Sequence, residues 1–530
     1  MTDETRKKTF LGFDFSTQRL KALVIGEDYE VLHEANVEFD VDLPEFRTAG
    51  GVLRGQQRGE VVAPPLLWVK ALDMVMDMLV VAGVDFSTIE ALSGAAQQHG
   101  SVWWSKDSEA KLNSLSPDDF LHTQLATAFV TDSPVWMDSS TSADCRALEE
   151  AVGGPEELAR ITGSTAYERF TGPQIRKMYR SRERVYHATS RISLVSSFAC
   201  SLFLGRIAPI DYSDGSGMNL LDIHNMKWNE KALKACGDDS LESKLGAPVP
   251  TASVLGPVSP YYVQRYGFKS DCKVVAFTGD NNSALAGLRL RAGWVGLSLG
   301  TSDTVLVGLE GPAAAAAGHV LVGPTPGAPY MALLCFANGS LTRQNHRDRL
   351  VGPSWEAFNE LLKTTVRGNM GHMGIYLDVA EIVPRVRAGC VWAEPGGRSA
   401  RPPAASYEAR ALLEGQALAR RLHAEDMGVI LDSSSRLVAT GGASVNKELL
   451  QIFADVFNTP VYVQNEHANA ALLGAAIRAA DVWSAEAGVK LSGADPSVSP
   501  VATPYPDHDQ IYKPMMPRYR QMIATFSKLE

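Results

Sequence analysis

Apolar residues gather into two short strand-like runs, and each run ends in a tight turn that carries hydroxyl groups. Residues 11–17 read Leu-Gly-Phe-Asp-Phe-Ser-Thr, and residues 297–303 read Leu-Ser-Leu-Gly-Thr-Ser-Asp. Further apolar residues follow each turn, so both segments predict β-hairpins. Backbone N–H groups and hydroxyls at such tips can cradle phosphate oxygens. One such turn would be ordinary, but two, one in each half of the chain, predict two related lobes that grip one polyphosphate.

The alternation of apolar and polar positions around these turns predicts a mixed α/β fold. Residues 10–41 predict three consecutive antiparallel strands, and residues 66–79 predict a helix. Residues 191–204 predict one further helix. Residues 273–288 and 436–457 each read strand, polar loop and helix. Such units repeated in two halves are typical of a duplicated α/β fold, whose ligands sit at the carboxyl ends of the strands.

Length and composition narrow the class of protein. The 530 residues exceed what one hydrophobic core usually supports, so we expect a first lobe at 1–276, a second lobe at 277–480, and a C-terminal extension at 481–530 that packs on the lobes. A formal net charge of −10 disfavours nucleic-acid binding, and the chain has no apolar run long enough for a membrane helix. Six cysteines without a Cys-x-x-Cys pair, together with a polar N-terminus, predict free thiols in a cytoplasmic protein.

Two aspartates occupy positions that suit a catalytic residue or a metal ligand. Asp280 follows a strand and precedes a helix, where free backbone N–H groups create a positive potential. It predicts a general base that accepts a proton from a substrate hydroxyl during phosphoryl transfer, although a helix N-cap is the commoner role of aspartate there. Asp14 lies inside an apolar strand, where an unpaired acid is costly to bury, so it predicts a ligand for the Mg²⁺ that accompanies nucleotide phosphates. A partly exposed turn aspartate is the alternative.

Other polar segments suit a nucleotide or a polyol. Gly441 and Gly442, between a strand and a helix, allow close approach of a flat ligand, and Asn446 could bond to a base or a ribose. A Gly-Gly pair is also common as a plain connector. His99, which follows two glutamines, and Arg169, which lies among aromatic residues, suit a polyol or serve as satisfied structural residues. The chain has neither the Gly-x-Gly-x-x-Gly nor the Gly-x-x-x-x-Gly-Lys-Ser/Thr phosphate motif.

In their order along the chain, these segments resemble the FGGY family of carbohydrate kinases. The resemblance is carried by residues 12–17, 95–100 with the run Gln-Gln-His-Gly, 136–141, 211–221, 277–281, 298–303 and 439–444. It implies two lobes of the actin/hexokinase-like (ribonuclease H-like) ATPase fold with a central cleft. It also implies that the first lobe holds the sugar and the second lobe holds ATP.

The resemblance assigns roles to individual residues. Asp280 matches the catalytic base of the family, which takes the proton of the C5 hydroxyl of D-xylulose as that oxygen attacks the γ-phosphate of ATP. Asp14 and Thr17 match the first phosphate turn of the family, and Thr301 matches the second. The residues that match sugar contacts are Gln98, His99, Arg169, Asp280 and Asn281. The residues that match nucleotide contacts are Thr17, Gly300, Thr301, Trp355, Gly441, Gly442 and Asn446.

The sequence departs from the family pattern in two places and leaves alternatives open. Thr278-Gly279 replaces a longer glycine run, and a loop is added at residues 47–61. Kinases of the family also act on ribulose, sedoheptulose, gluconate, fuculose or glycerol, but the Gln-Gln-His-Gly segment favours D-xylulose. A catalytically inactive sugar or ATP sensor is the non-enzymatic alternative, although it would be expected to lose Asp280 or Asp14. We expect a monomer or homodimer whose partner is a small sugar, with no nucleic acid and no membrane.

Overall fold

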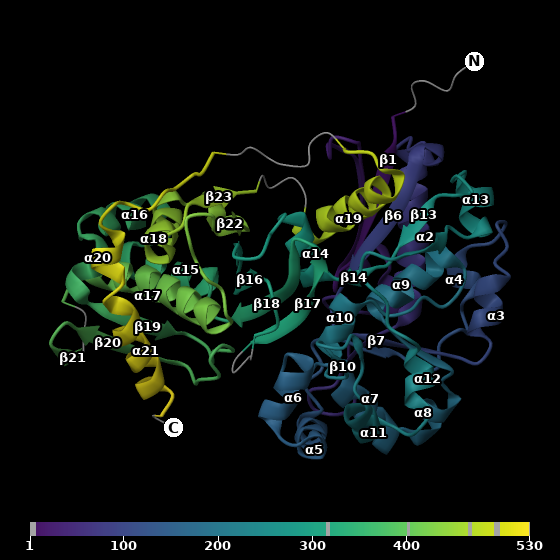
Figure 1. The fold of residues 1–530 in the computed structure, drawn as a ribbon, viewed down its shortest axis with the longest axis horizontal. Coiled ribbons are helices and arrows are strands. Elements are labelled where there is room, and N and C mark those ends of the chain that lie inside the picture. Colours follow the sequence, from purple (N-terminus) through teal and green to yellow (C-terminus); the bar gives the residue numbers. More distant parts are fainter. Residues whose placement is uncertain (1–6, 314–317, 400–402, 465–468, 492–498, 529–530) are drawn as a thin grey trace. The chain divides into compact units, whose positions relative to one another are not determined.

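The computed structural model describes residues 7–313, 318–399, 403–464, 469–491 and 499–528, and the chain forms two compact units (Figure 1). Unit 1 comprises Met1–Arg289, Leu321–Pro329 and Ala468–Pro496, and unit 2 comprises Leu290–Val320, Tyr330–His467 and Ser497–Glu530. Each unit combines a central sheet with helices, as the sequence predicts.

The central sheet of unit 1 has the strand order β12-β13-β6-β1-β2-β3, and β14 pairs with β6. Its strands are β1 (Thr9–Phe15), β2 (Arg19–Ile25), β3 (Val31–Glu38), β6 (Ile89–Ala96), β12 (Val254–Pro257), β13 (Lys273–Val275) and β14 (Thr278–Gly279). The antiparallel pairing of β1 with β2 and of β2 with β3 confirms the predicted three-stranded start. β6 runs parallel to β1 and to β14, and Ala95 faces Asp14 on one side and Thr278 on the other. The carboxyl ends of these three strands therefore meet at one edge.

Both faces of β1 are covered, which explains its almost wholly apolar sequence. Phe13 belongs to a large core that helices α2 (Pro65–Val81) and α9 (Val195–Leu204) complete. On the other face Phe10 packs against Trp483 of α19 (Ala470–Ala487), with ring centroids 5.5 Å apart. A Cβ atom on Gly12 would lie 2.6 Å from Ala476 N, so only glycine lets this helix approach the strand.

Shorter elements surround this sheet in unit 1. The helices are α1 (Phe39–Asp42), α3 (Ser108–Asn113), α4 (Leu121–Gln124), α5 (Ser142–Val152), α6 (Pro155–Thr162), α7 (Thr171–Ser181), α8 (Glu183–Ala188), α10 (Tyr212–Gly215), α11 (Glu230–Cys236), α12 (Leu241–Leu245), α13 (Pro260–Tyr266) and α14 (Asp280–Gly287). The strands are β4 (Leu53–Arg54), β5 (Val61–Ala63), β7 (Ser101–Trp104), β8 (Ser133–Pro134), β9 (Arg191–Leu194), β10 (Leu221–Asp222) and β11 (Lys227–Trp228).

The single helix predicted for residues 191–204 is wrong at its start. Arg191–Leu194 form strand β9, which pairs with β7, and only Val195–Leu204 form the helix α9. The partner strand β7 is distant in sequence, so its hydrogen bonds leave no trace in the local apolar pattern.

The second large sheet, most of whose strands belong to unit 2, has the strand order β17-β18-β16-β15-β22-β23. Its strands are β15 (Val295–Leu299), β16 (Asp303–Leu309), β17 (His319–Thr325), β18 (Ala328–Phe336), β22 (Leu437–Thr440) and β23 (Val461–Val463). The antiparallel pair β15 and β16 confirms the second predicted hairpin, and β22 runs parallel to β15. As in unit 1, a hairpin is followed by parallel strands, which agrees with the predicted duplication.

Helices and a small second sheet complete unit 2. The helices are α15 (Ser340–Val351), α16 (Trp355–Lys363), α17 (Ala405–Asp426), α18 (Lys447–Phe457), α20 (His508–Tyr512) and α21 (Met515–Phe526). The second sheet contains β19 (Met373–Leu377), β20 (Gly389–Glu394) and β21 (Gly397–Ser399).

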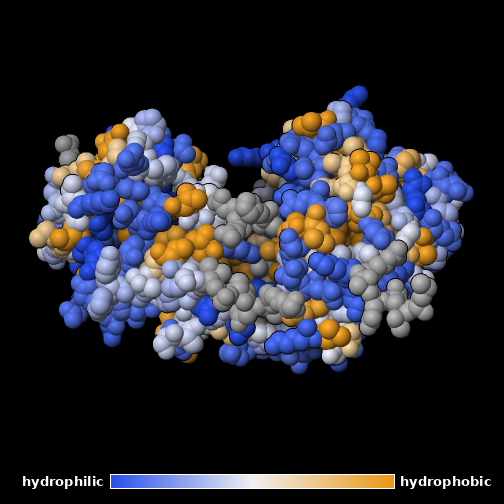
Figure 2. Space-filling view, turned by 90° about the horizontal axis from the view of Figure 1, so that it is seen from above, coloured by the Kyte–Doolittle hydropathy of each residue, from blue (hydrophilic) through white to orange (hydrophobic). Residues whose placement is uncertain are grey.

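On the face drawn in Figure 2, apolar side chains form small groups among hydrophilic ones. Among the described residues, every helix is too short or too polar to cross a bilayer.

Candidate active site

Asp280 is the first residue of α14 and lies at the edge where the parallel strands of unit 1 end. Gly279 takes the N-cap position, so Asp280 is not the capping aspartate. Its Oδ1 accepts hydrogen bonds from Asn281 N at 2.8 Å and from Asn281 Nδ2 at 3.0 Å. Loss of hydration raises the pKa of Asp280 to about 7, the charge of Asp14 adds to the rise, and the bonds from Asn281 oppose it. A carboxyl group with this pKa can exchange protons near neutral pH, as a general base must.

Asp14 is a second carboxyl group at this edge. It is fully buried, which raises its pKa, whereas a hydrogen bond from Ser16 and the charge of Lys21 oppose that rise. Ser16 Oγ donates to Oδ2 at 2.5 Å, and Lys21 Nζ lies 4.0 Å from the same oxygen. Oδ1 has no hydrogen-bond partner among the described residues. A buried carboxylate oxygen without a partner is costly unless a ligand completes its surroundings.

The described part of the chain has no group of three or more His, Cys, Asp or Glu side chains that could hold a metal ion. A cation here would depend on the open oxygen of Asp14, on water and on substrate oxygens. This donor set fits Mg²⁺, which keeps several waters and takes one or two carboxylates together with phosphates.

Gln98 links Asp280 to the interior of unit 1. Gln98 Oε1 accepts a hydrogen bond from Asn281 Nδ2 at 2.8 Å, and Gln98 Nε2 donates to Asn282 Oδ1 at 2.7 Å. Asn281 Nδ2 is thus shared between Gln98 and Asp280. The predicted sugar contacts Gln98 and Asn281 therefore belong to the network that orients the predicted base.

His99 has an unusual backbone conformation, with φ at 68°. This left-handed region is uncommon for residues other than glycine, and such strain is frequent at functional sites. Thr171 Oγ1 donates to His99 O at 2.9 Å, and the imidazole Nδ1 donates to Gly217 O at 2.9 Å. The ring also packs against Phe170, with centroids 4.4 Å apart. In the neutral ring these contacts leave Nε2 as the acceptor nitrogen.

Arg169 lies against two aromatic rings. Its guanidinium carbon lies 5.1 Å from the ring centroid of Trp136 and 4.7 Å from that of Tyr167. Trp136 Nε1 in turn donates to Thr17 Oγ1 at 2.8 Å. The structure thus connects Thr17 with Arg169 through Trp136. Thr17 lies at the end of residues 11–17, the first of the two turns predicted to bind phosphate, which we call the first phosphate turn. The sequence pattern assigns no role to Trp136, because an aromatic residue in a loop does not reveal which way its ring faces.

Asp211 and Asp214 are further buried carboxyl groups in this region. Asp211 Oδ2 accepts from Thr278 Oγ1 at 2.9 Å, which fixes the strand that precedes Asp280. Asp214 Oδ2 accepts from Ser196 Oγ at 2.5 Å. Burial raises the pKa of Asp214 well above its usual range, and the charges of Asp211 and Asp280 raise it further. The sequence shows both acids but not the bond of Asp211 with the strand before Asp280 or that of Asp214 with α9.

In unit 2 one pocket of about 530 Å³ contains most of the predicted nucleotide contacts. Among its lining residues are Gly300, Thr301, Trp355, Gly442 and Asn446. Its volume lies within the usual range of small-ligand sites, about 300–1,000 Å³. Residues that are far apart in the sequence, from the β15 hairpin to α18, are thus brought to one concave site.

The remaining residues around this pocket shape its wall. Gly441 has a φ of 87°, and a Cβ atom on it would lie 2.9 Å from Leu299 O, so glycine lets this loop pack against β15. Asn446 is the N-cap of α18, where its Oδ1 accepts from the N–H groups of Glu448 and Leu449 at 3.1 and 3.2 Å. Its Nδ2 donates to Asn359 Oδ1 at 3.2 Å. Asn446 therefore has a structural role whatever it binds.

Comparison with known proteins identifies the family of both halves of the chain. The N-terminal domain of the FGGY family of carbohydrate kinases matches residues 9–287, and the C-terminal domain matches residues 295–483. A xylulose kinase from Rattus norvegicus is 48% identical over 526 residues, 98% of this chain and 98% of the relative. Xylulose kinase 2 from Arabidopsis thaliana is 44% identical over 491 residues, 89% of this chain and 87% of the relative.

The fold is also shared with solved structures. The crystal structure of xylulose kinase from Rhodospirillum rubrum superimposes with a TM-score of 0.79 at 18% identity, over 98% of this chain and 99% of that one. The predicted fold class, an α/β protein of the actin/hexokinase-like type with two lobes, is therefore confirmed. Because both family domains match in order and relatives align over nearly the whole chain, the chain belongs to the FGGY family of carbohydrate kinases, enzymes that use ATP to phosphorylate a sugar.

Proposed function

We propose that this kinase phosphorylates the C5 hydroxyl of D-xylulose with ATP and releases D-xylulose 5-phosphate and ADP. The names of the rat and Arabidopsis relatives support this sugar. The observation that carries the chemistry is Asp280, whose pKa is raised to about 7 by loss of hydration and by the charge of Asp14. Near neutral pH a large fraction of Asp280 is ionised and able to take a proton.

The proposed reaction follows from this placement. The C5 oxygen of the sugar forms a bond to the γ-phosphorus of ATP while the bond from that phosphorus to the β-γ bridging oxygen breaks. The hydroxyl proton passes to Asp280, and the bond electrons leave with ADP. Asn281, held by Gln98, keeps the carboxyl group of Asp280 oriented for this transfer. Positioning and charge neutralisation contribute most of the rate in phosphoryl transfer.

We assign sugar binding to unit 1. Gln98, His99, Arg169 and Asn281 supply polar groups for the hydroxyls and the carbonyl of a ketose. The guanidinium of Arg169 is held over the Trp136 ring, which restricts where it can donate hydrogen bonds. His99 is held by its ring and backbone contacts in the same way.

We assign ATP binding to the pocket of unit 2, with Gly300, Thr301, Trp355, Gly442 and Asn446 on its wall and Gly441 behind it. Trp355 offers an aromatic face, and 37% of its surface is exposed. Thr17, in the first phosphate turn, is also assigned to ATP. Mg²⁺ would be held through water by Asp14, and when bound it neutralises phosphate charge.

All six cysteines are free thiols, which supports the expected cytoplasmic location.

A panel assay tests the proposal. ADP release by the purified chain is coupled to a reporter and followed with D-xylulose, D-ribulose, sedoheptulose, gluconate and glycerol. We expect the highest kcat/KM for D-xylulose, and ³¹P NMR of the product should show the phosphate on C5. A higher kcat/KM with another sugar would overturn the substrate assignment, and equal, negligible release with every sugar would favour a sensor.

A further inference from the structure

A buried ion cluster lies behind the second phosphate turn, and the roles assigned so far do not use it. Asp303, the first residue of β16, meets Arg343 of α15 and Arg420 of α17, and all three are at most 3% exposed. Arg343 Nη1 and Nη2 donate to the two carboxylate oxygens of Asp303 at 2.9 and 2.8 Å. Arg420 Nη2 donates to Asp303 Oδ2 at 2.9 Å. We call these three residues the Asp303 cluster.

The Asp303 cluster carries one more positive charge than negative charge. The other partners of the two arginines are neutral: Gln416 Oε1 and Ser340 Oγ accept from Arg343 at 2.8 and 2.7 Å, and Asn338 O accepts from Arg420 at 2.7 Å. Within the described residues, no second carboxylate forms an ion pair with either arginine. A net buried charge is unfavourable unless a counter-charge binds nearby.

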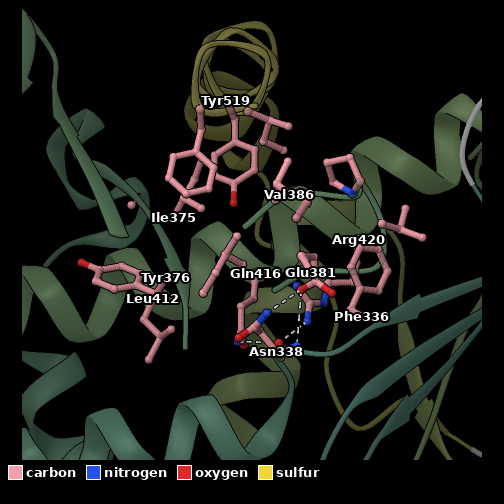
Figure 3. A pocket seen from close by; sticks show the side chains of 17 residues that line it. Phe336, Asn338, Ile375, Tyr376, Glu381, Val386, Leu412, Gln416, Arg420 and Tyr519 are labelled. Atoms are coloured by element: carbon pink, nitrogen blue, oxygen red, sulfur yellow. Dashed lines mark hydrogen bonds between the residues drawn. The ribbon is translucent and has the colours of Figure 1, made fainter. Parts of the chain in front are cut away.

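The surroundings of Arg420 keep water away from this charge. Figure 3 shows Arg420 with Gln416, Asn338 and Glu381 beside a small pocket, and the hydroxyl of Tyr519, from α21, points toward it from the other side. The pocket has a volume of about 40 Å³, and most of the residues that line it are apolar. The carboxylate of Glu381 is satisfied by its own neighbours, because its oxygens accept from Ala337 N, Ile382 N and the amide of Asn338. Apart from the charge of Glu381, little screening is therefore available to Arg420 inside the unit.

The opposite side of the Asp303 cluster opens on the nucleotide pocket. Arg343 and Ser340 line that pocket together with Gly300 and Thr301, and Arg343 is the one charged side chain among the described residues that line it. An exposed lysine, the common alternative for holding phosphate, does not occur there. The positive charge on this wall thus comes from a buried arginine.

The same residues hold the shape of the turn. Ser340 N donates to Gly300 O at 2.9 Å, and Leu341 N donates to Thr301 O at 3.3 Å. A Cβ atom on Gly339 would lie 2.6 Å from Asp303 N, so α15 begins in close contact with the turn. Any displacement of Asp303 would move both the charge and the turn.

We infer that the Asp303 cluster positions the second phosphate turn and supplies the positive charge that attracts the phosphates of a nucleoside di- or triphosphate into the pocket of unit 2. Arg343 and Arg420 provide the charge, and Asp303 fixes both guanidinium groups in place. The inference rests on the proposed ATP site. The cluster would favour binding of the phosphates of the nucleotide and would not affect binding of the nucleoside.

Calorimetric titration of the full chain with ADP and with adenosine tests this inference. Arg343→Met removes the charge and retains much of the apolar stem. We expect ADP to bind roughly tenfold to a hundredfold more weakly, because the variant loses a charged interaction with the phosphates. Adenosine has no phosphate, so its affinity should stay within about twofold of the wild-type value. Equal weakening of both ligands would indicate a merely structural role and overturn the inference, as would unchanged ADP binding.

Arg410→Met is the matched control. Like Arg343, Arg410 is a buried arginine with an acidic partner, Glu414. It belongs to α17 and does not line the nucleotide pocket. Its replacement should leave the ratio of ADP to adenosine affinity unchanged, and a shifted ratio would count against the inference. If Arg343→Met does not fold, Arg343→Gln retains polar contacts with Ser340 and Gln416 and should show the same selective loss. A wild-type chain that binds no ADP would overturn the ATP site itself, and this inference with it.

Discussion

The two phosphate turns each contain an aspartate, but the surroundings of the two side chains are opposite. Asp14, in unit 1, is buried with one oxygen unpartnered among the described residues, and its ion-pair neighbour Lys21 lies 4.0 Å away. Asp303, in unit 2, has both oxygens bonded to arginines at 2.8 to 2.9 Å. One carboxylate is left open to a ligand, whereas the other serves as an internal counter-ion.

This difference extends to the regions around the turns. In unit 1, Asp14 and Asp280 are close enough for one charge to raise the pKa of the other, and Asp211 and Asp214 lie nearby. In unit 2 the Asp303 cluster has a net positive charge. The two turns are similar in sequence but differ in charge, which fits the proposed roles: proton transfer and cation binding in unit 1, and attraction of the phosphates in unit 2.

The largest expected effect comes from replacing Asp280, the proposed general base in unit 1. Asp280→Asn should lower kcat with D-xylulose about a thousandfold, the range typical of a lost general base, while sugar binding persists. Coupled ADP release measures kcat, and calorimetry measures sugar affinity. Asp271→Asn, an exposed aspartate of the same unit, is the control. Near-normal turnover of the Asp280 variant would show that another group takes the proton.

Asp303, the counter-ion of the two arginines in unit 2, should contribute to the free energy of unfolding. Asp303→Asn leaves two buried arginines without a negative partner, so we expect the free energy of unfolding to fall by roughly 3–5 kcal/mol. Urea denaturation followed by circular dichroism measures the change. Asp509→Asn, at an exposed position of unit 2, should change it by less than about 0.5 kcal/mol. Equal stability of the Asp303 variant and the wild type would contradict the counter-ion role.

Replacement of Asp14, the unpartnered carboxylate of the first turn, should change the Mg²⁺ requirement and the pH dependence of activity. Asp14→Asn should lower kcat roughly a hundredfold and raise the Mg²⁺ concentration needed for half-maximal activity, because it removes the proposed metal ligand. It also removes a charge that raises the pKa of Asp280, so the acid limb of the residual activity should move to lower pH. Both shifts are measured in pH and Mg²⁺ titrations of kcat. An unchanged Mg²⁺ requirement would argue against the metal assignment.

The pH dependence of the unmodified enzyme tests the acidic side directly. Since the pKa of Asp280 is raised to about 7, the base is ionised above that pH and protonated below it. We expect kcat/KM for D-xylulose to fall about tenfold per pH unit on the acid side. A profile that stays flat down to pH 5, with the protein still folded, would exclude this assignment.

The smallest effect is expected at the contact between the first turn and Arg169. Trp136→Phe retains an aromatic ring but loses the hydrogen bond to Thr17 Oγ1, so KM for D-xylulose should rise about threefold to tenfold. Steady-state kinetics measure the change. Trp294→Phe removes an indole donor to Ser434 O in unit 2 and should leave KM for the sugar unaltered.

Local patterns predicted much of this fold. The apolar pattern predicted the β1 and β15 hairpins, because buried strands consist mostly of apolar residues and end in polar turns. It did not separate β9 from α9, because the strand there depends on pairing with β7. The predicted base and nucleotide residues were recognised by motif order, and their roles in this chain stay predictions. Trp136 and Asp214 received no role, because a loop sequence does not determine which way a side chain points.

The sequence by itself determined the fold class, the family, the two turns and the aspartate that each turn contains, since these depend on residue type and short-range order. Only the tertiary structure decided which of those aspartates is open and which is paired. Arg343 and Arg420 come from helices 40 and 117 residues beyond Asp303, and ion pairs over such separations arise from the packing of α15 and α17 against β16. The charge of the second turn therefore depends on long-range contacts that no local pattern records.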